Sequence, residues 1–205
     1  MCIDVYMDII LSPEKVDVQE CDVVVAGFFQ DERPLQGSSG WIDWRLNGRL
    51  SRILIEKRLT GEWKETTLIP SQGRLTPGLI LLIGLGKVKE YSYLRVRELP
   101  LYLLEALEKL CVPNICLSLP YDESYNVDCG KLAEILIEGI ADCLDSGEYS
   151  FHKEWLNNLR LFFAEGEEKF PEILLGVKTA KSILQGRFRI RIFVPTEKAP
   201  KTPSL

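Results

Sequence analysis

The sequence has 205 residues, of which 46% are hydrophobic and 27% charged, with a formal net charge of -5. A chain of this length can form one domain with a single large core, burying roughly 70% of its unfolded surface. The composition is that of a soluble globular protein and excludes a disordered chain, and the acidic balance gives no general attraction to nucleic acid or anionic lipid.

The first part of the chain predicts two strands and a helix. Residues 4–11 alternate partly between apolar and polar, as in a strand. Residues 21–29 form a continuous β-branched, apolar run, which is typical of a strand inside a sheet. A helix is expected from its N-cap, Ser38 or Ser39, to about Leu59, although an interior glycine lowers its propensity by about 1 kcal/mol relative to alanine.

The next segments predict a short strand and the strand at the centre of the sheet. Residues 66–69 form the short strand before a proline. Residues 79–83 are five large aliphatic side chains without polar alternation, a pattern that favours a strand covered on both faces. Gly84 and Gly86 follow and permit a tight turn at the end of this strand.

The third part of the chain predicts two amphipathic helices around one strand. The first helix is expected to start near Leu99, with Pro100 in its first turn, where the missing N–H costs nothing. Residues 115–119 predict the strand. The second helix, with a wide apolar stripe, is expected to be capped by Asp128 or Asn126.

The last part predicts a strand at residues 159–164, a helix at 167–185 and an alternating strand with one solvent-exposed face at 187–194. The proline-rich and lysine-rich residues 195–205 are expected to be a disordered tail or linker. Strands thus alternate with helices, which predicts a single domain over residues 1–194. Its fold class is α/β, a three-layer α/β/α sandwich with a mixed central sheet.

The sequence contains no membrane span and no metal-binding pattern. No apolar run reaches the roughly 18 to 20 residues that a span needs, and the start lacks the basic residues of a secretory signal, so a cytoplasmic location is expected. There is no Cys-x-x-Cys pair, and the single histidine, His152, is expected in an exposed loop. The six scattered cysteines are expected to be reduced thiols. They are Cys2, Cys21, Cys111, Cys116, Cys129 and Cys143.

Two glycine-containing segments are candidate ligand-binding sites. One precedes the first expected helix, where free N–H groups and the positive end of the helix dipole can hold a phosphate, although a capped loop without ligand explains it equally well. The other follows the central strand but has neither the third glycine of a dinucleotide fingerprint nor P-loop spacing, so a tight turn is favoured. The candidate residues are Gly37, Ser38, Ser39, Gly40, Gly84 and Gly86.

Other polar patterns favour structural roles. Arg187, Arg189 and Arg191 share one side of the last expected strand and can meet phosphates, but a solvated strand face is the usual meaning of such alternation. No serine has a histidine and an acid as evident partners, so acyl transfer is unsupported. The tryptophans are not spaced as a stacking platform, and core or partner contacts are expected for them.

The order of several short segments carries a family resemblance. The segments are Asp22-Val23-Val24-Val25-Ala26-Gly27-Phe28-Phe29, Ile42-Asp43, Leu46-Asn47-Gly48-Arg49-Leu50-Ser51, Gly61 with Lys64-Glu65, and Leu82-Ile83-Gly84-Leu85-Gly86-Lys87. Together they resemble the N-terminal domain of the leucyl (cytosol) aminopeptidase family. This resemblance implies a macro-domain-like α/β fold, in agreement with the three-layer prediction.

The resemblance also implies where the chemistry of the family lies. In that family a separate C-terminal domain holds two divalent metals through lysine, aspartate and glutamate side chains around an Asn-Thr-Asp-Ala-Glu-Gly-Arg motif. Nothing in these 205 residues matches this motif, and two-metal hydrolysis depends on such a cluster of ligands. We therefore expect no catalytic residue, cofactor or metal in this chain. The asparagine-rich segment and long glycine loop of macro domains that bind ADP-ribose are also missing.

Three functions follow as hypotheses. The first is a non-catalytic domain that associates with itself or regulates a catalytic peptidase partner, with Trp41 and Trp44 as a contact surface. The second is a module that binds a small molecule or nucleotide through residues 37–40. The third is an aminopeptidase by similarity alone, without the catalytic half. Membrane and nucleic-acid partners are not expected.

Overall fold

Seven strands form one mixed sheet in a computed structural model that describes residues 6–146 and 150–194. The strand order is β3-β4-β2-β5-β6-β1-β7. All neighbouring pairs are parallel except β3 and β4, which are antiparallel, so the mixed sheet is confirmed. The tail predicted at residues 195–205 lies outside the described residues. The strands are β1 (Tyr6–Ser12), β2 (Val23–Phe28), β3 (Thr66–Pro70), β4 (Leu79–Gly84), β5 (Asn114–Ser118), β6 (Arg160–Ala164) and β7 (Arg189–Phe193).

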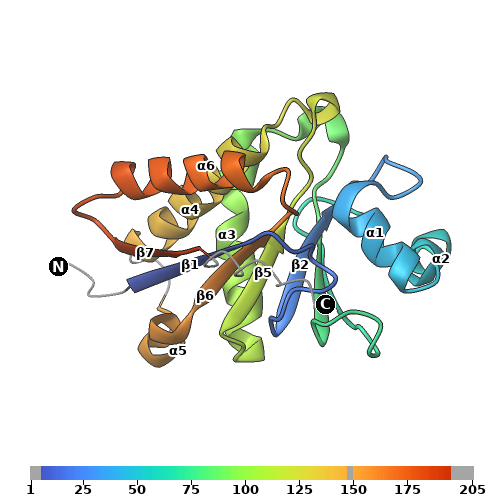
Figure 1. Cartoon of the computed structure of the whole chain (residues 1–205). Coiled ribbons are helices and arrows are strands. Elements are labelled where there is room, and N and C mark those ends of the chain that lie inside the picture. Colours follow the sequence, from blue (N-terminus) through green and yellow to red (C-terminus); the bar gives the residue numbers. More distant parts are fainter. Residues whose placement is uncertain (1–5, 147–149, 195–205) are drawn as a thin grey trace, which may run out of the picture.

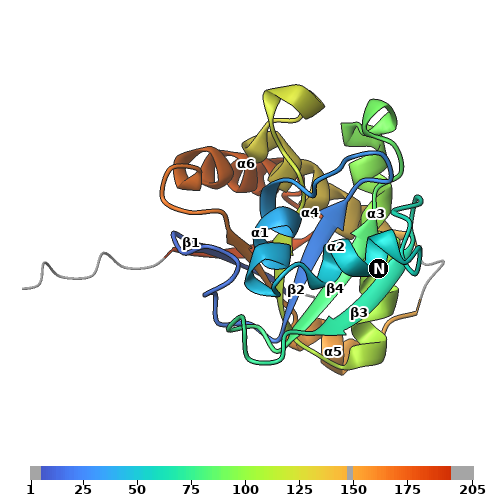
Figure 2. The ribbon, with the colours of Figure 1, turned by 90° about the vertical axis from the view of Figure 1, so that its right-hand side faces the viewer.

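Helices cover both faces of the sheet and confirm the three-layer architecture. Helices α3, α4 and α6 pack on one face, and α1 and α2 pack on the other face over β2 and β4 (Figures 1 and 2). Strand β2 serves both cores, because Val23 and Val25 point to the first and Val24 and Ala26 to the second. The helices are α1 (Gly37–Arg45), α2 (Arg49–Ile55), α3 (Tyr93–Leu110), α4 (Cys129–Asp145), α5 (Lys153–Asn158) and α6 (Phe170–Ile183).

Strand β4 is buried as predicted, but it is not at the centre of the sheet. Five of its six residues are buried. It lies second from the edge, between β2 and the antiparallel β3, and β5 occupies the middle position. A continuous apolar run indicates that both faces of a strand are covered, and helices cover both faces of β4. The run does not indicate how many strands lie on either side.

The single helix expected up to Leu59 is two helices, and its N-cap is not a serine. The segment between α1 and α2 breaks at Asn47 and Gly48, whose φ values are 57° and 70°. The buried carboxylate of Asp43 accepts hydrogen bonds from the Leu50 N–H (2.7 Å) and the Ser51 N–H (3.2 Å), so it caps α2 from within α1. The N-cap of α1 is Gln36, which makes no side-chain cap hydrogen bond.

Helix α3 starts six residues before the predicted position. Its N-cap is Ser92, whose hydroxyl accepts a hydrogen bond from the Arg95 N–H at 3.5 Å. Pro100 therefore lies inside the helix, where it removes one backbone hydrogen bond. It is buried against α4, where a Cβ on Gly139 would lie 3.0 Å from its ring. Close packing of α3 on α4 offsets the local cost of this proline.

The remaining elements agree with the sequence except near His152. Asp128 caps α4, with its carboxylate accepting from the Lys131 N–H at 2.8 Å. The sequence missed the short helix α5, and His152 is its N-cap. The histidine is exposed as expected, but its Nδ1 lies 3.0 Å from the Glu108 carboxylate, a partner distant in sequence.

The arginines near β7 are paired within the chain. Arg191 forms two hydrogen bonds to the Asp8 carboxylate, and Arg189 donates to the Tyr6 hydroxyl. Arg187 precedes the strand and pairs with Asp145. The five described cysteines are free thiols, as predicted. No helix in the described part of the chain is long and apolar enough to cross a membrane.

Candidate functional site

The carboxyl ends of the parallel strands meet at one edge of the sheet, which is where α/β proteins usually bind ligands. Ser118 is the last residue of β5, and Glu165 directly follows β6. Strands β5 and β6 are neighbours, so these two polar side chains come together. Helix α1 begins beside them and contributes Ser38.

A cavity of about 330 Å³ opens at this edge. Pockets that enclose small ligands measure about 300 to 1,000 Å³, so this one suits a small molecule better than a dinucleotide. A second hollow of about 670 Å³ adjoins it and shares Lys15, Trp41, Tyr121 and Glu165. The cavity is lined by Lys15, Val16, Gly37, Ser38, Trp41, Leu119, Pro120, Tyr121, Tyr125, Ala164 and Glu165.

Four side chains, Ser38, Ser118, Glu165 and Tyr121, form a hydrogen-bonded chain beside the cavity. The Ser118 hydroxyl lies 2.5 Å from the Ser38 hydroxyl and 2.6 Å from Oε1 of Glu165. One hydroxyl has one proton, so Ser118 donates to the ionised carboxylate and accepts from Ser38. The Tyr121 hydroxyl donates to Oε2 of Glu165 at 3.2 Å. Each carboxylate oxygen therefore has one partner and keeps a free lone pair.

Burial raises the pKa of Glu165 to about 7, because the charged form loses hydration. The hydrogen bonds from Ser118 and Tyr121 act in the opposite direction and are too weak to cancel this effect. Near neutral pH this side chain therefore exists in both protonation states. Carboxyl groups with such pKa values are concentrated at functional sites.

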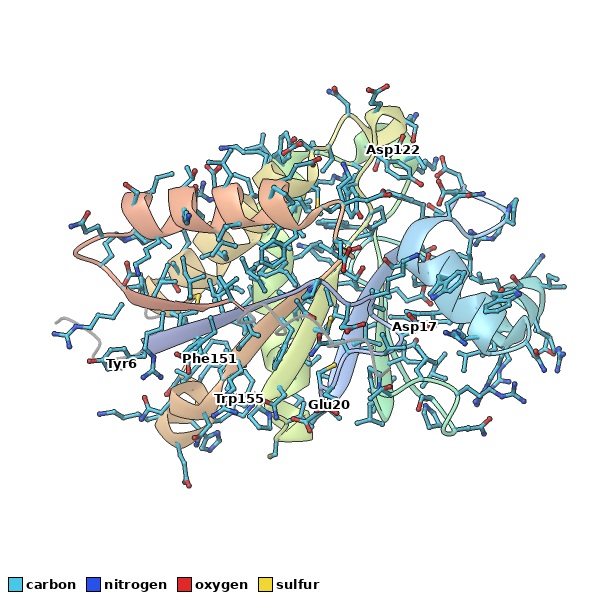
Figure 3. All side chains as sticks on the ribbon, in the orientation of Figure 1. Tyr6, Asp17, Glu20, Asp122, Phe151 and Trp155 are labelled. Carbon is cyan, nitrogen blue, oxygen red and sulfur yellow. The ribbon has the colours of Figure 1, made fainter. Side chains whose placement is uncertain are left out.

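The connection between β5 and α4 forms one wall of the cavity and is held by aromatic contacts. The Tyr91 hydroxyl donates to the Pro120 carbonyl at 3.0 Å, and the Tyr125 hydroxyl donates to Glu32 at 2.6 Å. The ring of Phe29 lies between two tyrosines, with its centre 5.0 Å from that of Tyr91 and 5.1 Å from that of Tyr125. Figure 3 shows Asp122 at the outer tip of this connection. These contacts hold the wall in place, and none of them involves the Glu165 carboxylate.

Another part of the cavity wall carries a cation, Lys15, and one indole ring, that of Trp41. The Lys15 ammonium lies 5.4 Å from the centre of the Trp41 ring, within the range of a cation–π contact. Trp41 and Trp44 stack with ring centres 5.0 Å apart. Arg45 lies over both rings and forms an ion pair with the buried Asp17, which Figure 3 shows beside α1. Trp41 and Trp44 therefore stack on each other, a contact that the sequence analysis did not predict.

The structure separates the residues predicted as ligand-binding from the sequence. Gly37 and Ser38 line the cavity, whereas Ser39 is buried and its hydroxyl donates to the Gln36 carbonyl. A Cβ on Gly40 would lie 2.4 Å from the Leu35 carbonyl oxygen, so close backbone packing explains this glycine.

The glycines after β4 do not reach the cavity. A Cβ on Gly84 would lie 2.0 Å from the Glu62 carbonyl oxygen, and Gly86 has a φ of 72°. The Gly86 N–H donates to the Gly61 carbonyl at 2.9 Å. These two glycines permit close contact with the turn before β3, and a ligand role for them stays a prediction.

Sequence reasoning missed Ser118, Tyr121, Glu165 and Lys15. A signal was present, since Ser118 and Glu165 are polar residues at the ends of two apolar strands. Using it requires knowing that β5 and β6 are neighbours, which the sequence did not establish. Among residues 6–146 and 150–194, no three or more histidine, cysteine, aspartate or glutamate side chains are arranged to hold a metal ion.

Comparison with protein families gives one match over most of the chain. The model described as the cytosol aminopeptidase family, N-terminal domain, matches residues 24–153. A probable cytosol aminopeptidase of Sulfurihydrogenibium sp. is 25% identical over 171 residues, which cover 83% of this chain. One from Alkaliphilus oremlandii is 22% identical over 207 residues and covers 97% of it. The chain spans 31% and 40% of the length of these two relatives.

Solved structures with the same fold fall into two groups. A mutant of tomato leucine aminopeptidase is similar with a TM-score of 0.59 and 18% identity, over 88% of this chain and 37% of that one. A mutant macrodomain of Oceanobacillus iheyensis has a TM-score of 0.60 and 13% identity, over 85% of this chain and 92% of that one. A Trypanosoma brucei macrodomain in complex with ADP has a TM-score of 0.60, 17% identity and coverages of 82% and 67%. These similarities confirm a macro-domain-like fold.

Proposed function

Since the family model covers more than half of its length, this chain belongs to the cytosol aminopeptidase family as an N-terminal domain, and from this premise we propose that it is a non-catalytic module. It acts by associating with further copies of itself or by regulating a catalytic peptidase partner. A cytosolic location, suggested by the names of its relatives, is part of the proposal.

The exposed tryptophan pair on α1 is the observation that carries this proposal. Trp44 is 64% exposed and Trp41 39% exposed, and their stacked rings form one continuous apolar surface. Tryptophan and arginine are enriched at the centres of protein interfaces, and Arg45 lies over both rings. Large apolar side chains gathered at one exposed place support a protein contact.

Replacing Trp44 by alanine is expected to weaken self-association at least tenfold. The indole is exposed, so its removal leaves the cores intact and deletes contact area together with the stacking on Trp41. Light scattering of the purified chain over a range of concentrations measures the mean mass. A matched control is Ile55→Ala, because Ile55 is 81% exposed on α2. A wild-type chain that stays monomeric at all concentrations would remove the self-association part of the proposal.

The regulatory part predicts an effect on a catalytic partner. Adding the chain to a full-length cytosol aminopeptidase is expected to change the rate of hydrolysis of leucine p-nitroanilide about twofold or more, and Trp44→Ala is expected to abolish the change. The chain alone, with manganese or zinc added, serves as the control and is expected to be inactive. Chelator-sensitive hydrolysis by the chain alone would instead show that it is an enzyme.

A second candidate function, binding of a small molecule, is favoured by the cavity beside Glu165. The fold is shared with a macrodomain in complex with ADP. However, Glu165 faces the cavity, and an ionised carboxylate repels phosphate groups. We therefore expect a ligand of different charge from a nucleotide.

A further inference from the structure

The backbones of Lys15 and Glu165 lie side by side, but their charges do not meet. An isolated antiparallel bridge pairs the two residues, and the Gly166 N–H donates to the Glu14 carbonyl at 3.1 Å. Side chains of directly opposed residues project from the same face. Both line the cavity, yet the salt bridges formed within the described residues include neither Lys15 nor Glu165. Opposite charges thus border one small space without contact between them.

Each of the two groups is placed to meet a charged part of a ligand. Glu165 keeps a free lone pair on each oxygen after accepting from Ser118 and Tyr121. An ammonium group has three donors and can use these lone pairs. Lys15 supplies the positive charge, and the first turn of α1 adds N–H groups at Gly37 and Ser38, since Gln36 provides no side-chain cap.

The rest of the lining is apolar and aromatic. Trp41, Leu119, Pro120, Tyr125 and Val16 surround the charged pair. Such a lining accepts an aliphatic or aromatic side chain and gives no polar partner for a sugar ring beyond the hydroxyls already bonded. The volume of about 330 Å³ limits the ligand to a small metabolite.

We propose that this cavity binds a free apolar α-amino acid, with its ammonium group on Glu165, its carboxylate toward Lys15 and the first turn of α1, and its side chain against Trp41. This inference rests on the second candidate function, small-molecule binding at this cavity. An apolar amino acid is also the product that a leucine-releasing peptidase partner would make, and Trp41 belongs to both the cavity and the exposed pair. The ligand therefore lies where it can alter partner binding.

Calorimetric titration with L-leucine is expected to show saturable binding. N-acetyl-L-leucine, which lacks the ammonium charge, and 3-methylbutylamine, which lacks the carboxylate, are each expected to bind at least tenfold more weakly, because each loses one charged contact. Glu165→Gln and Lys15→Met are expected to reduce affinity for L-leucine at least tenfold. Glu20→Gln is the matched control, since Glu20 precedes β2 at the opposite edge of the sheet and is labelled in Figure 3.

Binding is also expected to release protons. At pH 7 about half of the Glu165 side chains are protonated, and the ammonium group selects the ionised form, so about half a proton leaves per ligand. Titration in two buffers with different ionisation enthalpies measures this number. Three neighbours of Glu165 keep their protons near pH 7, because burial raises the pKa of Tyr121 and Cys129, and a hydrogen bond with Cys21 together with burial raises that of Cys116. The nearby Glu172 carboxylate forms an ion pair with Lys169.

The outcomes separate this inference from the function on which it rests. Binding of ADP-ribose without binding of L-leucine or L-phenylalanine at millimolar concentration would overturn the amino-acid inference and support the small-molecule module. No saturable heat with any of the three would overturn both. Equal affinity of L-leucine for the wild type and Glu165→Gln would overturn the assignment of this site, as would binding without proton release.

Discussion

Glu165→Gln is expected to stabilise the protein by about 2 kcal/mol at pH 8 and to leave its stability unchanged near pH 4. The folded-state pKa of Glu165 is about 7, above its ordinary value of 4.5. A rise of this size corresponds to roughly 3 kcal/mol at 1.36 kcal/mol per pKa unit, and the partial exposure of the side chain reduces the expected effect to about 2 kcal/mol.

The direction of the pH dependence follows from which state holds the proton. Between pH 4.5 and 7 the folded protein keeps the Glu165 proton and the unfolded chain releases it. The stability contributed by the neutral acid is therefore complete below about pH 4.5 and is lost as the pH rises through 7. Glutamine stays neutral, and its carbonyl oxygen still accepts from Ser118, so the variant should lack this loss.

Urea denaturation at pH 5, 6, 7 and 8 measures the difference between the variant and the wild type. The other ionisable groups titrate equally in both proteins and cancel in the difference. Glu20→Gln, with an exposed carboxylate far from the cavity, should follow the wild type at every pH. Parallel curves for the wild type and Glu165→Gln would show that Glu165 titrates normally.

A stabilising substitution at this position would mean that the wild-type carboxylate is retained at a cost. Residues that bind ligands often lower stability, because their charges are kept partly desolvated and ready for the ligand. A gain in stability together with a loss of leucine affinity in the same variant would therefore indicate that Glu165 is kept for ligand binding at the expense of stability. A buried glutamate without a ligand role would show the gain in stability but not the loss of leucine affinity.

The strands could be predicted from sequence because their signal is local. The continuous apolar runs of β2, β4, β5 and β6 mark segments covered on both faces, and each was placed within about two residues of its observed ends. The order of these strands could not be predicted in the same way. Nothing in the run at residues 79–83 indicates that β4 lies next to the edge.

The helix boundaries that failed depend on contacts distant in sequence or on single residues. The break between α1 and α2 needs the positive φ of Gly48 together with the Asp43 carboxylate that caps α2. The early start of α3 places Pro100 inside a helix, which local propensity disfavours and packing against Gly139 offsets. Tertiary packing outweighs propensity at both places.

The candidate site was only half visible in the sequence. Ser38 belongs to the predicted glycine-containing segment and lines the cavity as a residue of α1. Glu165 looked like one of three acidic residues in a polar connection, and its role depends on the neighbours that β5 and the bridge to Lys15 bring to it. A site assembled from four separate segments has no spacing that a sequence pattern can reveal.

Gly176→Ala is expected to destabilise the protein by about 2 kcal/mol. A Cβ at this position of α6 would lie 1.9 Å from the Gly130 carbonyl oxygen and 2.6 Å from its carbon. Both atoms belong to the backbone of α4, so the two helices must separate. Overpacking costs about 1 to 3 kcal/mol or more, and this cost exceeds the gain of about 1 kcal/mol that alanine brings to a helix.

Thermal unfolding should show the effect as a fall in Tm of about 6 °C for a chain of this length. Gly78→Ala is the matched control, because a Cβ at Gly78 meets nothing within 4 Å and its φ is ordinary, so its Tm should stay close to that of the wild type. The variant should also bind L-leucine more weakly, since α6 begins shortly after Glu165 and α4 shortly after Tyr125. An unchanged Tm would mean that α4 and α6 are not in close contact at Gly130 and Gly176.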